Sequence, residues 1–366
     1  LQTQPVPDEL RLWGVESVDD VVKRLKERAN HRRTVSVDRV ADLGLRWEDE
    51  GPTRSKSGYF ARMGERDYRL SDGAVKSLNR LMSGPQLKHW NKYQDRNAFV
   101  KAAINILDNP DRREHGGMFM RHDGLEINCF LPSNYVMRDS HEMLTDFVGM
   151  LDDNIGDIRG VSSSEEGYGD RCIYRVIMGD NLMPAARAEY GQYMMFMLSM
   201  SETGQCDSTT SLGLYRTVCT NSAIREQTLS RWNNRSGGES KFYDATGETI
   251  RMTGYLKSQF SQVFGELFNL RLEHDPIELL NTMQQGKIIT REHWVTSKVH
   301  AELPTEDGRP CTTHYDLFNA MTHGAKELSS LNAREQAEQT TLHLFTAPGG
   351  LYQELRSAMN RQRIRN

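Results

Sequence analysis

Apolar positions along the chain follow two periods, and each period predicts a different secondary structure. Between 72 and 82, Ala74, Leu78 and Met82 recur every four residues, which predicts a helix with one buried face and Ser71 as its N-cap. The same period predicts further helices at 18–33, 95–107 and 139–151 and, from about residue 249 onward, at 249–269, 276–285, 291–302, 313–329, 332–345 and 350–362.

Alternating or continuous apolar stretches predict strands. Residues 58–70 contain two such stretches around Gly64, and 117–131 contains two more around Asp123-Gly124, a dipeptide typical of two-residue hairpin turns. A predicted helix follows each hairpin, so the same unit occurs twice. Further strands are predicted at 172–178, 190–201 and 212–219, whereas the composition of 48–57, 152–170 and 231–240 predicts linkers or loops.

The segregation of these elements along the chain indicates the fold class. Strand signals concentrate between 58 and 220, and helix signals follow residue 245. We therefore expect an α+β fold, with a mainly antiparallel sheet and hairpin–helix units in the N-terminal two thirds and a helical C-terminal third. The expected division is an N-terminal helical or linker segment (1–50), an α+β sheet domain (51–245) and a helical C-terminal region (246–366).

Composition narrows the class of protein. Of the 366 residues, 37% are hydrophobic, and no apolar run approaches the ~20 residues that a membrane-spanning helix needs, so no membrane partner is expected. The five cysteines include no CxxC pair, which argues against a disulfide framework or a zinc ribbon. The first residues lack the apolar core of a signal peptide. We expect a cytoplasmic protein, in the host cytoplasm if a phage encodes it.

Charge is distributed unevenly, although the net formal charge is only -4. Residues 52–113 contain 13 Lys and Arg against 6 Asp and Glu, a local charge of +7. Residues 114–170 contain 3 against 12, a local charge of -9. The two blocks can bind a charged partner, neutralise each other within the fold, or pair between subunits, and the sequence leaves these alternatives open.

The basic block is the candidate nucleic-acid-binding region, because its cations are interleaved with aromatic residues. Cations neutralise phosphates, and exposed rings stack on unpaired bases. Phe60 and Arg62 share one face of their predicted strand. Tyr59, Ala61 and Met63 occupy the other face, and aromatic residues in strands more often belong to a core. The candidate binding residues are Arg54, Lys56, Arg62, Arg66, Arg69, Lys76, Arg80, Lys88, Lys92 and Arg96.

No catalytic motif is recognisable, and no catalytic residue is assigned. The sequence contains no GxxxxGK[ST], no GxGxxG after a strand, no GxSxG and no HExxH. His293 and His300 are seven residues apart on a predicted helix, which favours an ordinary surface pair over a metal site, and neither a metal nor a cofactor is expected. The remaining candidates for a site or a structural motif are Cys219, Thr220, Asn221, Asn319 and Thr322, for which turn formation and helix docking are the plainer explanations.

Three segments resemble one known family. Residues 214–222 (Leu-Tyr-Arg-Thr-Val-Cys-Thr-Asn-Ser) are similar to the R-x-V-C-T-N-G signature of the phage and plasmid proteins in domain-of-unknown-function family 932, with Ser222 where the family usually has Gly. Residues 68–78 resemble an early strand–helix segment of that family, and 315–322 resemble its late N-A-x-T helix. The resemblance implies a phage or plasmid origin and, more loosely, a role in DNA replication or recombination. It implies no catalytic residue.

These observations favour a non-enzymatic protein over an enzyme. The first hypothesis is a phage-type accessory protein of DNA replication or recombination that binds nucleic acid, above all single-stranded DNA, as a single-strand-binding or annealing factor. One alternative is a phage structural or assembly protein without catalytic activity, and a homo-oligomer is expected in either case. The other alternative is an enzyme with a site near Cys219, Asn221 and Asn319.

Overall fold

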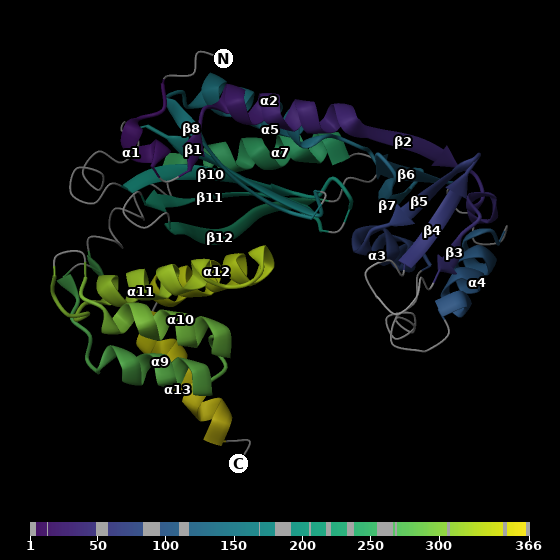
Figure 1. Ribbon diagram of the computed structural model, residues 1–366. Coiled ribbons are helices and arrows are strands. Elements are labelled where there is room, and N and C mark those ends of the chain that lie inside the picture. Colours follow the sequence, from purple (N-terminus) through teal and green to yellow (C-terminus); the bar gives the residue numbers. More distant parts are fainter. Residues whose placement is uncertain are drawn as a thin grey trace.

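The described residues form two sheets and a helical C-terminal region (Figure 1). The structure is a computed structural model, and it describes residues 5–12, 14–48, 58–82, 96–109, 117–167, 169–179, 192–204, 206–216, 221–232, 238–254, 266–267, 269–305, 308–346 and 350–363. The expected α+β class is confirmed, because both sheets are mostly antiparallel and the region after residue 270 is helical.

Sheet A is antiparallel and buried on both faces. In spatial order its strands are β1 (Val15–Glu16), β8 (Ile158–Glu166), β9 (Arg171–Met178), β10 (Gln192–Met200), β11 (Ser208–Arg216) and β12 (Asn221–Trp232). Along β9, Tyr174 and Val176 belong to the largest apolar cluster, whereas Ile173 and Ile177 pack on the opposite face with Leu10. A strand buried on both faces has no polar side to display, which explains the continuous apolar runs in β9 and β10.

Three helices lie along one face of sheet A (Figure 1). They are α2 (Val18–His31), α5 (Ser140–Asn154) and α7 (Gly238–Arg251), and the short α1 (Asp8–Arg11) precedes β1. The starts of α2 and α5 each have a local cause. The Ser17 hydroxyl accepts a hydrogen bond from the Asp20 amide at 3.1 Å, and Asp139 with Glu142 forms the capping box of α5. Phe147 in the middle of α5 is fully buried in the cluster of sheet A.

The C-terminal helices form a separate group, in which α12 and α11 lie nearest to β12 (Figure 1). They are α9 (Pro276–Gln285), α10 (Arg291–Glu302), α11 (His314–Lys326), α12 (Leu331–Thr346) and α13 (Gly350–Arg363). Helix α12 contacts both β12 and β8 of sheet A, and its Glu335 forms an ion pair with Arg171 at the start of β9. Across the described residues, every helix falls short of the length and apolar content needed to cross a bilayer.

Sheet B forms a second lobe with its own core. In spatial order its strands are β2 (Arg32–Val37), β6 (Met118–Asp123), β7 (Glu126–Pro132), β5 (Arg66–Leu70), β4 (Gly58–Met63) and β3 (Arg46–Glu48). The helices α3 (Asp72–Leu81) and α4 (Arg96–Leu107) and the 3-10 turn Val40–Leu43 pack on its inner face. Tyr59, Leu78 and Phe130 belong to this core, which is separate from the cluster of sheet A.

The loop predicted at 152–170 is wrong for its central part, because β8 occupies Ile158–Glu166. Serine side chains of β8 accept hydrogen bonds from arginines of α2 and of the neighbouring strand β9. Arg24 donates to Ser163 at 2.8 Å, and Arg175 of β9 donates to Ser164 at 3.1 Å. Backbone pairing with the buried β9 and these side-chain bonds stabilise a strand whose composition by itself indicates a loop.

The expected domain limits also differ from the arrangement of the elements. Residues 1–50, expected as a helical or linker segment, contribute β1 to sheet A and both edge strands, β2 and β3, to sheet B. The limit after residue 245 falls inside α7, which packs on sheet A. The strand β12 was not predicted, and α7 begins within the loop predicted at 231–240.

Candidate functional site

Five of the ten cations predicted to bind nucleic acid have described side chains, and all five are exposed. They are Arg62, Arg66, Arg69, Lys76 and Arg80. Arg54, Lys56, Lys88 and Lys92 lie outside the described residues, and Arg96 begins α4 but its side chain is not described. Only the first five can therefore be placed on a surface.

Sheet B separates these cations into two groups. Cross-strand pairing places Arg69 of β5 opposite Phe60 of β4. It also places Asp67 opposite Arg62, two residues further along β4, so both pairs share one face of the sheet. Tyr59 points to the other face and belongs to the core with α3 and α4. The alternation predicted for this strand is confirmed.

Lys76 and Arg80 form the second group, four residues apart on the exposed side of α3. The guanidinium of Arg80 donates to the carbonyl oxygen of Gly204, in the turn between β10 and β11. Because α3 packs on the inner face of sheet B, this group and the first lie on opposite sides of the sheet. Arg66 lies beside the hairpin turn at Gly64. The five described cations therefore do not form one connected surface.

A third arginine joins Phe60 on its face of the sheet, and sequence reasoning missed it. Arg46 of β3 pairs opposite Phe60, and its guanidinium carbon is 5.8 Å from the centre of the Phe60 ring. Arg46 donates to Glu48 and forms an ion pair with Asp67 at 2.9 Å. The hydrogen bond to Glu48 is the main cause that raises the pKa of Arg46. Arg46 is thus compensated by two carboxylates.

Arg62 and Arg69 are the other two arginines on this face, and Glu126 of β7 pairs beside Arg69. The side chain of Arg62 is 62% exposed, and its Nε is 3.9 Å from Asp67, at the limit of an ion pair. Arg69 is exposed and has no carboxylate partner among the described residues. The half-buried ring of Phe60 lies opposite Arg69 and two positions from Arg62. We call the set Arg46, Glu48, Phe60, Arg62, Asp67 and Arg69 the outer face.

Several carboxylates of the acidic block 114–170 are paired with arginines, three of which belong to the block itself. Four of its described carboxylates form ion pairs with arginines: Asp139 with Arg121, Asp146 with Arg138, Asp157 with Arg159 and Glu165 with Arg28. None of these arginines belongs to the basic block 52–113. The two blocks therefore do not neutralise each other through these pairs.

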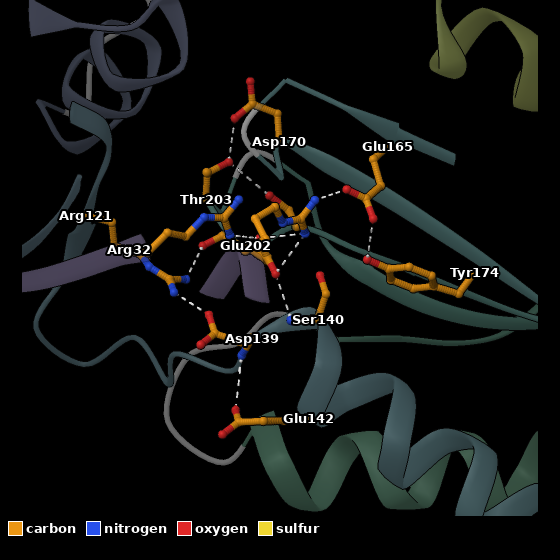
Figure 2. A network of polar contacts seen from close by, with 12 residues as sticks. Arg32, Arg121, Asp139, Ser140, Glu142, Glu165, Asp170, Tyr174, Glu202 and Thr203 are labelled. Carbon is orange, nitrogen blue, oxygen red and sulfur yellow. Dashed lines mark hydrogen bonds and ion pairs between the residues drawn. The ribbon is translucent and has the colours of Figure 1, made fainter. Parts of the chain in front are cut away.

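A buried polar network joins the two lobes (Figure 2). At its centre is Glu202, in the turn after β10, which is 3% exposed. Its carboxylate accepts hydrogen bonds from Arg32 at the start of β2, from Arg28 of α2, and from the amide of Ser140 at 2.7 Å. Burial alone would raise the pKa of Glu202, but the charges of Arg32 and Arg28 outweigh it and lower the pKa to about 2.

Arg121 of β6 extends this network towards α5. It donates to Asp139 and, at 3.2 Å, to the backbone carbonyl of Glu202. Burial by itself would lower the pKa of Arg121, but the charge of Asp139 outweighs it, and the pKa is raised. Asp139 is at the same time the N-cap of α5, so the start of this helix is tied to sheet B.

A second link joins the turn after β10 to the start of α3. Asp170 accepts a hydrogen bond from the Thr203 hydroxyl at 2.7 Å and lies against the first turn of α3. A Cβ atom at Gly73 would lie 3.0 Å from the Asp170 carboxylate and 3.1 Å from the Asn128 carbonyl oxygen, so any larger residue here would force these neighbours to shift by a few tenths of an ångström.

The chemistry of the network is structural. A carboxylate that is buried and held ionised well below neutral pH by two arginines is a poor proton acceptor at neutral pH. The groups around Glu202 come from α2, β2, β6 and α5, so the network fixes how the two lobes are oriented. It holds the outer face of sheet B in place relative to sheet A.

Of the polar residues suggested near a second site, only Asn319 and Thr322 have described side chains. Asn319 and Thr322 lie on α11, where the buried Thr322 hydroxyl donates to the carbonyl oxygen of Asn319 at 3.0 Å. Cys219 and Thr220 lie outside the described residues, and Asn221 begins β12 with an undescribed side chain. The hydrogen bond of Thr322 satisfies its hydroxyl within the helix.

The two histidines of α10 have separate environments. His293 is buried, and its Nε2 is 2.8 Å from the carbonyl oxygen of Met321; burial lowers its pKa. His300 bonds Glu327 at 2.8 Å and stacks on His323 with ring centres 4.9 Å apart. In the part of the chain that the structure describes, no three His, Cys, Asp or Glu side chains are grouped so that they could hold a metal ion.

Sequence reasoning missed Arg46 and the whole Glu202 network. Arg46 lies just before the predicted linker, in a strand of only three residues. Glu202 and its partner Arg32 are 170 residues apart, and no local pattern connects them. The one signal in the sequence was Glu202, which follows the apolar strand β10 after a single serine. A glutamate at that place indicates a turn as readily as a buried ion pair.

Comparison with known proteins adds no assignment. No family model matches the chain, and neither the curated proteins nor the solved structures contain a significant match. The resemblance to domain-of-unknown-function family 932 stays a prediction based on its motifs.

Proposed function

We propose that this protein binds single-stranded nucleic acid on the outer face of β3, β4 and β5. The supporting observation is a solvent-exposed face of an antiparallel sheet on which Phe60 lies next to the exposed Arg62 and Arg69. Aromatic rings on such a face stack on unpaired bases, and arginines beside them bind the phosphates. Duplex bases are already stacked on each other, so this chemistry favours single strands.

The charges on this face define what kind of binding is expected. Arg46 is compensated by Glu48 and Asp67, so it stiffens the surface around the Phe60 ring rather than adding net charge. Arg62 and Arg69 are available for phosphates. Two phosphate contacts on a single strand correspond to a slope of about -1.4 in log K against log salt. The face therefore contributes a modest, sequence-tolerant affinity.

The proposed biological setting rests on the motifs of the sequence. If the resemblance to the phage and plasmid family holds, the binding serves DNA replication or recombination, as a single-strand-binding or annealing factor. The outer face needs no catalytic group for that role. The described part of the chain supplies no observation that favours the enzymatic alternative near Cys219 and Asn319.

Fluorescence anisotropy with a labelled oligothymidine at several salt concentrations tests the proposal. Arg62→Gln with Arg69→Gln should weaken binding roughly tenfold or more at low salt and reduce the salt slope by about 1.4. Phe60→Leu should cost about 1–3 kcal/mol of binding free energy while leaving the slope unchanged, because it removes stacking but no charge.

The matched control is Lys23→Gln with Lys26→Gln, which removes the same charge from the exposed side of α2 on the other lobe. This control should bind like the unmodified protein. If the two double variants weaken binding equally, the attraction is a property of the overall charge and the outer face is not the site. If the unmodified protein does not bind at low salt, the proposed function is refuted.

A further inference from the structure

Helix α10 has its polarity reversed relative to an ordinary surface helix. The side towards α11 buries His293, Ser297 and Ala301, which are polar or small. The side towards solvent carries Val295, Val299 and Leu303, which are 47%, 51% and 52% exposed. The three aliphatic residues follow one another every four positions, so they form a continuous stripe along the helix.

The contacts of the buried side fix this orientation. A Cβ atom at Gly324 of α11 would lie 2.5 Å from the Ser297 amide nitrogen, so the two helices approach as closely as a glycine permits. The Thr296 hydroxyl donates to the Gly324 carbonyl oxygen at 2.8 Å, and His293 bonds the Met321 carbonyl oxygen. Rotation of α10 to bury the stripe would break all of these bonds. The stripe therefore faces solvent in the isolated chain.

The composition of the stripe is typical of an interface. Valine is a poorer helix former than alanine, lysine or glutamate. Two exposed valines on one helix face therefore favour neither the helical conformation nor contact with water. Isolated exposed aliphatic residues are common, but a contiguous row is typical of a docking surface. The stripe ends at Leu303, where an open groove of about 810 Å³ begins, lined on one side by Glu302 and Asp275.

We propose that a second copy of this chain covers the stripe. The two α10 helices would pack antiparallel on their solvent sides, about a twofold axis at the level of Ser297 along the helix. In that arrangement Val295 of one copy lies opposite Val299 of the other, and each Arg291 lies opposite Leu303 and next to Glu302 of the other copy. The interface is self-complementary, as a twofold contact must be. It buries all six aliphatic side chains and forms two ion pairs at its ends.

The charges around the stripe favour this occupant. Arg291 at the first position of α10 and Glu302 at its last position are both exposed, so the antiparallel pair brings opposite charges together. Glu302 also forms an ion pair with Lys298 of its own helix at 3.6 Å, which leaves its exposed carboxylate able to accept a second cation. Glu292 does not oppose Glu302 of the other copy, because its carboxylate accepts a hydrogen bond from the Ser329 amide at 3.1 Å and is turned towards the α11–α12 turn. A parallel arrangement would place like charges opposite each other.

The expected dimer is weak. A contact between single helices lies below the ~1,200 Å² of a stable interface, and affinities in the micromolar range or weaker are the norm for such areas. Self-association should therefore depend on protein concentration. It requires neither nucleic acid nor the outer face, so its failure leaves the proposed function untouched.

Sedimentation velocity over a range of concentrations tests the proposal. The unmodified chain should shift from monomer to dimer as its concentration rises. Val295→Glu with Val299→Glu should remain monomeric, with its helical circular dichroism unchanged because both positions are exposed. The control Leu12→Glu with Leu125→Glu introduces the same charges at exposed apolar residues elsewhere, 83% and 60% exposed, and should dimerise normally.

A charge exchange tests the antiparallel geometry. Arg291→Glu and Glu302→Arg should each weaken the dimer at least fivefold, and the combined variant should recover most of the loss. A monomer at every concentration, or a dimer that survives Val295→Glu with Val299→Glu, overturns the proposal. A combined charge variant that is no better than the single ones refutes the antiparallel arrangement.

Discussion

Replacing Glu202 by glutamine should uncouple the two lobes. The glutamine keeps the size of the side chain but removes the negative charge that Arg28 and Arg32 share. The buried Arg32 guanidinium then loses its principal counter-charge, whereas Arg28 keeps its ion pair with Glu165. A buried ion pair adds little stability compared with an apolar pair of the same size. Removing only one of its partners is nevertheless strongly destabilising, because the remaining charge stays buried without water around it.

The pKa of Glu202 provides the magnitude and its dependence on pH. Folding lowers this pKa from the ordinary value of 4.5 to about 2, a shift that corresponds to about 3 kcal/mol of stability at neutral pH. Because the folded pKa is the lower one, this stability is fully present above pH 4.5. It is lost as the pH falls from 4.5 towards 2, where Glu202 becomes protonated in the folded protein as well.

Urea denaturation at pH 7 and again near pH 2.5, followed by tryptophan fluorescence and by far-ultraviolet circular dichroism, measures both quantities. Glu202→Gln should lower the free energy of unfolding by about 3 kcal/mol at pH 7, and the two proteins should become more alike in acid. The control Glu65→Gln alters an exposed carboxylate of a hairpin turn and should change little. A difference below about 1 kcal/mol at pH 7, or one that is equally large in acid, would refute the assigned role of Glu202.

Two further predictions concern helix packing and capping. Gly324→Ala should destabilise the protein by about 1–3 kcal/mol in thermal unfolding, because the new methyl group would lie 2.5 Å from the Ser297 amide nitrogen. Gly149→Ala is the control on α5, where open space surrounds the new methyl group, and it should stabilise the protein by roughly 0.5–1 kcal/mol. Thr313→Ala removes the hydroxyl that accepts from the Asp316 amide at 3.1 Å and should cost about 1 kcal/mol by the same measurement, with an unchanged melting temperature contradicting the capping box of α11.

The candidate site was predictable only where neighbouring residues decide it. The shared face of Phe60 and Arg62 follows from the alternation of side chains in one strand, and the structure confirms it. The approach of Arg46 to Phe60 depends on the pairing of β3 with β4 at the edge of sheet B, which no local pattern indicates. Lys76 belongs to the same charge block as Arg62 but lies on the other side of the sheet. The count of charges along the chain could not predict this, because it does not say which face of an element a residue occupies.

What the sequence by itself determined is the set of helices and hairpins whose signals are local. The cap at Ser71 and the hairpin around Gly124 depend on residues within a few positions of each other, and both were predicted and found, although Asp123 ends β6 and the turn consists of Gly124 and Leu125. The α+β class follows from the order of these elements along the chain.

Only the tertiary structure decided how the strands divide into two sheets and what joins them. The polar β8 is a strand because it pairs with β9 and because distant arginines bind its serines. Glu202 is buried because Arg28 and Arg32 arrive from another part of the chain to balance its charge. Such contacts gain their energy from groups far apart in sequence, so they exist only once the fold has brought those groups together.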